Sequence, residues 1–131
     1  MAVKLHNPGY NHAKELIGER HAVLDDRDSW SEHQPSAAEE NAFIDAHGYR
    51  EYGRWHLAVD DAANPETKGH YKFPYGDFHD VHRCAILSAE SRAAQRKYAD
   101  VQSAAAHIHG MLETLRQGVS SGSAAPRQSA R

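Results

Sequence analysis

Apolar residues recur at helical spacing in several stretches of the chain and alternate with polar residues in two shorter ones. Near the N-terminus, Tyr10, Ala13 and Ile17 fall on one face of a helix. Asn7 is a favourable N-cap for that helix, and Pro8 suits its first position, where no backbone N–H is needed. The pattern therefore predicts a first amphipathic helix that begins at this Asn-Pro pair.

A second helix is predicted over residues 37–47, where the chain carries both start and stop signals. Ser36 and Glu39 form an S-x-x-E capping box, and acidic residues occupy the first turn. Phe43 supplies part of the apolar face, and Gly48 is expected to end the helix.

Two strands are predicted after the second helix. Within residues 54–61, Trp55, Leu57 and Val59 alternate with their neighbours, as in a strand with one buried face. Residues 70–75 alternate again, and the proline among them restricts this strand to an edge or requires it to end there. We expect the two strands to form an irregular β-hairpin that packs on the helices, because an isolated hairpin is only marginally stable.

Two further helices are predicted, from Asp80 to about Lys97 and over about residues 100–115. Asp77 is a suitable N-cap for the first of them. The apolar stripe of the second indicates that the two helices pack as an αα-hairpin. Residues 116–131 are rich in Gly, Ser, Ala and Pro without apolar periodicity, which predicts a disordered tail.

The predicted fold class is therefore α+β and mainly helical, with about four helices, one short β-hairpin, a C-terminal αα-hairpin and a disordered tail. A chain of 131 residues accommodates one small domain. We assign that domain to residues 1–115 and the tail to residues 116–131.

Composition narrows the classes of function. No stretch approaches the ~18 consecutive apolar residues of a membrane helix, and the N-terminus lacks the apolar region of a signal peptide. The single Cys84 excludes an internal disulfide, so a reduced, cytoplasmic protein is expected. Residues 19–66 carry twelve acidic against four basic side chains, and this acidic half disfavours broad binding of nucleic acid.

Histidine is abundant, with eleven in the chain, and His79 and His82 lie three residues apart. On a helix such a pair can converge on one metal ion, to which Asp77 or Asp80 adds an oxygen ligand. This alternative predicts a divalent transition metal such as Zn²⁺, Ni²⁺ or Fe²⁺. The H-x-x-H signal is weak, however, and the competing interpretation has His79 capping or packing the helix start and His82 on its exposed side.

The segment HYKFPYGDFHDVHR, residues 70–83, holds the candidate binding residues. No nucleophile motif or glycine-rich phosphate loop accompanies it, and Cys84 lies among apolar residues that suit a core position. An enzyme is therefore disfavoured. The residues expected to bind a partner are Lys72, Tyr75, Asp77, His79, His82 and Arg83.

A resemblance to known proteins rests on four segments: DDRDSWSEHQPSAAEENAFI, YGRWHLAVD, ETKGHYKFPYGDFHDVHRCAILSAESRAAQ and AAAHIHGML. Over roughly residues 1–115 the chain resembles a family of small uncharacterised bacterial proteins. The run NPETKG, then YKFP and the helices behind it, is also loosely similar to a module attached to tailed-phage prohead proteases. Because the chain has no protease portion, the resemblance implies a fold and no catalytic residues.

Three functional hypotheses follow. The leading one is a non-catalytic cytoplasmic interaction module of phage or mobile-element origin, with no cofactor and with another protein as its partner. A homo-oligomer is an open alternative, because the apolar stripe of the fourth helix can pair with a second copy. The second hypothesis is a metal-dependent protein or enzyme with a His/Asp site where the hairpin meets the third helix. The third is nucleic-acid binding through the C-terminal helical hairpin, whereas a membrane is not an expected partner.

Overall fold

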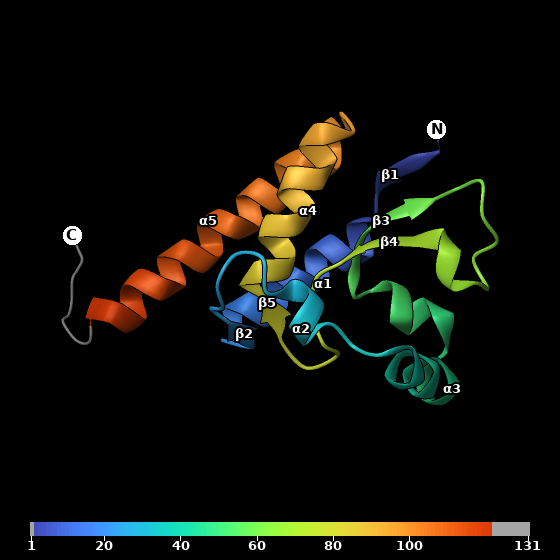
Figure 1. Ribbon diagram of the computed structural model, residues 1–131, viewed down its shortest axis with the longest axis horizontal. Helices are drawn as coiled ribbons and strands as arrows, with labels where there is room; N and C mark the ends of the chain where they lie inside the picture. Colours follow the sequence, from blue (N-terminus) through green and yellow to red (C-terminus); the bar gives the residue numbers. More distant parts are fainter. Residues whose placement is uncertain (1, 122–131) are drawn as a thin grey trace.

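The computed structural model describes residues 2–121 and confirms a mainly helical α+β fold. Within these residues there are five α-helices and two small sheets (Figure 1). The helices are α1 (Asn7–Gly18), α2 (Trp30–His33), α3 (Ala37–Gly53), α4 (Arg83–Gln95) and α5 (Ala99–Ser121). The strands are β1 (Val3–Leu5), β2 (Ala22–Val23), β3 (His56–Asp60), β4 (Tyr71–Pro74) and β5 (Val81–His82), with a 3₁₀ turn at Lys68–His70 before β4.

The larger sheet has the strand order β1-β3-β4 and is antiparallel. The predicted hairpin is present as β3 and β4, whose pairing joins Val59 to Tyr71 and His56 to Pro74. Strand β1 was not predicted, because three residues are too few for a periodic signal. The expectation of one exposed face on β3 is wrong: His56 and Ala58 are buried as deeply as Leu57, since α1 and α5 pack against this central strand.

The smaller sheet pairs β2 with β5 in parallel and brings together two distant parts of the chain. Ala22 lies opposite Val81 and Val23 opposite His82. This pairing places the loop that follows β2 directly beside the start of α4 (Figure 1). Neither strand was predicted, and the candidate site described below depends on their contact.

Helix α3 begins as predicted and continues further. Ser36 accepts from the Glu39 backbone N–H at 3.1 Å, and the Glu39 carboxylate accepts from the Ser36 N–H at 2.8 Å, which confirms the capping box. Gly48, with φ 88°, interrupts the helical backbone where the sequence predicted a stop. A further short turn of helix then runs to Gly53.

The C-terminal helices pack together as the predicted αα-hairpin, but their bounds differ from the prediction (Figure 1). Helix α4 begins at Arg83 with His82 as its N-cap, so Asp77 does not cap it. The backbone N–H of Val81 donates to the His21 carbonyl, which holds the residues before Arg83 in extended pairing. Helix α5 continues to Ser121, so residues 116–121 are helical, and the rest of the predicted tail lies outside the described residues.

The core lies between α1, the central strand β3 and the α4–α5 hairpin. Small side chains on α4 allow α5 to approach closely, since Ala85, Ala89 and Ala93 are buried. No helix in the described part of the chain has the length and apolar character needed to cross a bilayer. The largest fully buried side chains are Tyr75, Leu57, Ile86, Leu87, Ile108 and Leu112.

Buried His56 is expected to make stability depend on pH. Burial lowers the pKa of its imidazole to about 3, although its Nδ1–H donates to the Tyr52 carbonyl at 3.0 Å. The unfolded chain protonates this histidine near pH 6.5, whereas the folded protein excludes the proton until about pH 3. The contribution of neutral His56 is therefore complete above pH 6.5. It falls by about 1.4 kcal/mol per pH unit as the pH drops below that value.

Urea unfolding at pH 7 and pH 5 measures this effect in the wild type and in a His56→Phe variant. The variant should lose less stability between the two pH values than the wild type does. His6 and His12, whose pKa values burial also lowers, contribute to the slope that remains in both proteins. Equal losses in the two proteins would contradict the assignment.

Candidate metal centre

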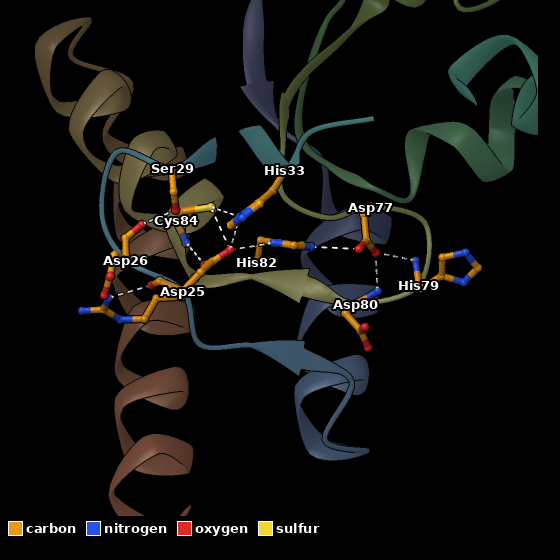
Figure 2. Close-up of polar contacts among 10 residues, drawn as sticks. Asp25, Asp26, Ser29, His33, Asp77, His79, Asp80, His82 and Cys84 are labelled. Atoms are coloured by element: carbon orange, nitrogen blue, oxygen red, sulfur yellow. Dashed lines mark hydrogen bonds and ion pairs between the residues drawn. The ribbon is translucent and has the colours of Figure 1, made fainter. Parts of the chain in front are cut away.

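Four side chains with metal-binding atoms converge beside the β2–β5 pair. Asp25 follows β2, His33 ends α2, His82 lies in β5 and Cys84 lies in the first turn of α4. One ligand atom from each residue lies within 4.8 Å of those from the other three. Figure 2 shows the four side chains directed toward one another from these separate segments.

The carboxylate of Asp25 is the centre of the cluster. Its Oδ2 accepts hydrogen bonds from His33 Nδ1 and His82 Nδ1, each at 2.7 Å, and from the Cys84 thiol at 3.1 Å. Its Oδ1 accepts from the Cys84 backbone N–H at 2.7 Å. Burial raises the pKa of Asp25, but these hydrogen bonds outweigh burial and hold the pKa below its usual value. The carboxylate is therefore ionised and fixed in orientation.

His82 is held between two carboxylates and is buried. Its Nδ1–H donates to Asp25, and its Nε2–H donates to Asp77 Oδ2 at 2.9 Å. Burial disfavours protonation of His82, but the hydrogen bonds to Asp77 and Asp25 outweigh burial and raise its pKa. Asp77 is itself positioned, since its Oδ1 accepts from the backbone N–H groups of His79 and Asp80. A carboxylate behind a histidine is the arrangement that orients imidazole ligands in metal sites.

Cys84 is a poor nucleophile in this setting. It is buried, and burial together with the nearby Asp25 carboxylate raises the pKa of its thiol to about 12. The thiol therefore stays protonated unless a cation replaces its proton. A metal ion between the sulfur and the Asp25 carboxylate would provide that positive charge, and coordinating thiols lose their proton for this reason.

Contacts outside the cluster hold its segments in place. Arg83 donates to the Asp25 carbonyl at 3.0 Å and to the Glu113 carboxylate at 2.8 Å, which ties the loop after β2 to both C-terminal helices. Trp30 on α2 packs against the His82 ring at a centroid distance of 5.6 Å. Only His33 is substantially accessible, with 37% of its side chain exposed. The cluster is thus rigid on three sides and reaches solvent at His33.

The structure separates the four metal ligands that the sequence suggested. His82 belongs to the cluster and is buried, so its predicted place on an exposed helix side is wrong. The ring of His79 points away from the cluster (Figure 2). Asp77 contacts His82 from behind, and Asp80 lies 3.5 Å from His21 instead. These residues do not form one site because the segment before α4 is extended and turned, not helical.

The other predicted binding residues have different surroundings. Tyr75 is fully buried and donates its hydroxyl to the Arg54 carbonyl, so it is a core residue and not a binding one. Arg83 is committed to Asp25 and Glu113. Lys72 lines a cleft next to Cys84.

Sequence reasoning missed Asp25, His33 and Cys84 as ligands. One local signal was present: His82 and Cys84 lie two apart, and in an extended segment that enters a helix both can face one point. Asp25 and His33 come from the acidic loop and had no such signal. Only the β2–β5 pairing places them opposite the His-Arg-Cys run.

The donor set favours a particular class of ion. Imidazole nitrogen, thiolate and one carboxylate suit Zn²⁺ and similar transition metals, whereas Mg²⁺ and Ca²⁺ prefer oxygen ligands. An ionised Asp25 and a Cys84 thiolate would together neutralise a divalent charge. Around Zn²⁺, bonds of ~2.0–2.3 Å place tetrahedral ligand atoms roughly 3.2–3.8 Å apart. The tight contacts to Asp25 would then widen, with His33 on its short exposed helix free to adjust.

Comparison with known proteins identifies no relative of this chain. No protein-family model matches the chain, and no curated protein or solved structure is significantly similar to it.

Proposed function

We propose that this protein binds one divalent transition-metal ion, with Zn²⁺ preferred, through Asp25, His33, His82 and Cys84. The observation that carries the proposal is the convergence of three donors on one carboxylate oxygen, Asp25 Oδ2. Three neighbouring donors compete for this single acceptor. One cation bound to all four groups would replace the three hydrogen bonds and remove that competition. The Asp77 carboxylate behind His82 supports the same interpretation.

The proposed ion has a structural role. Four protein ligands fill a tetrahedral zinc sphere, and filled spheres are typical of structural sites, whereas catalytic sites leave a position open for water. The ion would join the loop after β2, helix α2 and the β5–α4 junction, and would add to the contacts that Arg83 and Trp30 already make between these segments. A free Cys84 thiol persists most readily in a reducing compartment, so we propose a cytoplasmic location. The interaction-module and nucleic-acid hypotheses stay predictions beside this one.

Metal analysis of the untagged protein tests the proposal. We expect about one zinc per chain after dialysis against a limited excess of Zn²⁺, and a Co²⁺-loaded form with the intense visible bands and near-ultraviolet thiolate band of a tetrahedral site. The Cys84→Ser variant should lose the thiolate band. His79→Ala is the matched control, because it removes a neighbouring histidine whose ring lies outside the cluster.

Two results would refute the proposal. One is a metal content far below one per chain in protein that remains folded. The other is an unchanged Co²⁺ spectrum in Cys84→Ser. If instead the wild-type Co²⁺ spectrum is weak and octahedral, the ion has additional water ligands, and the structural role would have to be abandoned in favour of an open site.

A further inference from the structure

A cleft of about 660 Å³ lies beside the cluster and shares Cys84 with it. Its walls come from strand β4, helix α4 and the segment that contains α2. Figure 1 shows these elements next to one another on one side of the α4–α5 hairpin. A volume of this size falls within the ~300–1,000 Å³ range of small-molecule sites.

Four cationic side chains line this cleft, although the chain as a whole has a net charge of −3. Lys72 comes from β4, Arg92 from α4, Arg96 from the end of α4 and Arg27 from the loop before α2. Two carboxylates, those of Asp28 and Asp60, also line it, so its local charge remains positive.

The cations of the cleft have no partners of their own in the described part of the chain. Within residues 2–121, none of the side chains of Arg27, Lys72, Arg92 and Arg96 takes part in a hydrogen bond or an ion pair. Arg54 and Arg83, outside the cleft, are by contrast paired with glutamates. Basic side chains that surround a concave site without partners favour an anionic ligand.

The rest of the lining is suited to a flat apolar group. Ala85, Ser88 and Ala89 form a small-residue wall on α4, and aromatic rings from Trp30, Phe73 and Tyr98 face the same space. The rings of Phe73 and Tyr98 are in edge contact at 6.2 Å.

Phe73 also has an unusual backbone conformation. Its φ of 60° lies in the left-handed region, which is strained for a bulky residue. Strain of this kind gathers at ligand sites, where surrounding structure maintains it.

We propose that this cleft binds a small organic phosphate, whose dianionic group contacts the cations and whose ring lies against the aromatic side chains. Phosphate fits better than a single carboxylate because Arg92 and Arg96, one helical turn apart, together with Lys72 from β4, offer more donors than two oxygens accept. The inference goes beyond the metal centre. It does not require the ion, because none of the four cleft cations belongs to the cluster of proposed metal ligands.

Isothermal titration with phenyl phosphate tests the proposal, with inorganic phosphate and phenol as probes of the two halves of the ligand. We expect phenyl phosphate to bind more tightly than either probe, in both chelated and zinc-loaded protein. Removing a charged donor from a bound phosphate should weaken binding about tenfold for Lys72→Ala and for Arg92→Ala. Arg50→Ala is the matched control, because Arg50 is exposed on α3 and does not line the cleft.

The outcomes that would overturn the proposal are distinct. Binding equal to that of inorganic phosphate would leave the aromatic wall without a role. Binding that requires zinc and disappears in Cys84→Ser would assign the phosphate to the metal itself. A single-stranded oligonucleotide that binds more tightly than phenyl phosphate, with steep salt dependence and weaker binding in Lys72→Ala, would assign the basic side chains to nucleic acid. Circular dichroism of each variant verifies that the fold is intact.

Discussion

Chelation of zinc is expected to lower the free energy of unfolding by about 4 kcal/mol, relative to protein held with free zinc at about 1,000 times its dissociation constant. The reason is that the unfolded chain scatters the four ligands, so the ion binds the folded state preferentially. Asp25 and His82 lie 57 positions apart in sequence, and the β2–β5 pairing brings them together. Urea unfolding with and without a chelator measures the difference.

Substitution of Asp25 separates the ion's effect from other effects of the chelator. Asp25→Ala should abolish the zinc-dependent gain, because it removes the group on which the other three donors converge. It should also destabilise the zinc-free protein, because buried His82 loses one of its two carboxylate partners. Asp26→Ala is the matched control, since Asp26 is exposed and its side chain is outside the cluster. A zinc-dependent gain retained in Asp25→Ala would contradict the assigned ligands.

The sequence predicts the parts of this fold whose causes are local. The capping box at Ser36 and Glu39 requires only residues three apart, and the structure contains both of its hydrogen bonds. The β3–β4 hairpin likewise joins two strands that follow each other along the chain, with only residues 61–70 between them. In each case the interacting groups lie close together in the sequence, so their pattern is sufficient.

The candidate site could not be predicted in the same way. Its ligands are united by β2 and β5, which have two residues each and therefore no readable periodicity. The acidic residues before α4 resemble a helix start, but a long-range hydrogen bond from Val81 to His21 keeps that segment extended. Because of this tertiary contact, the nearby residue that can share a metal ion with His82 is Cys84 and not His79. Tertiary contacts of this kind override local helix propensity, because the propensity of each residue is only a weak preference.

The burial of strand β3 also differs from the prediction, because both of its faces are covered. Its alternation predicted one buried face, yet His56 is 2% exposed and Ala58 fully covered. Helix α1 packs against this strand and approaches it closely at Gly9. The backbone N–H of His6, just before the helix, donates to the Leu57 carbonyl at 2.8 Å and fixes the approach. The sequence offers no sign that this glycine lies against a strand.

Gly9→Ala is expected to destabilise the protein by more than about 4 kcal/mol, at the extreme of single substitutions. A Cβ at this position would overlap the His56 carbonyl oxygen and lie 2.9 Å from its carbonyl carbon. Both are backbone atoms of the central strand, so no side-chain rotation relieves the overlap, and α1 must move away from β3. Gly110→Ala is the matched control on α5, where a Cβ meets nothing within 4 Å. There the same change should stabilise the helix by about 0.5–1 kcal/mol. Urea unfolding of both variants compares them, and a loss below about 1 kcal/mol in Gly9→Ala would show that α1 does not press on β3 at this point.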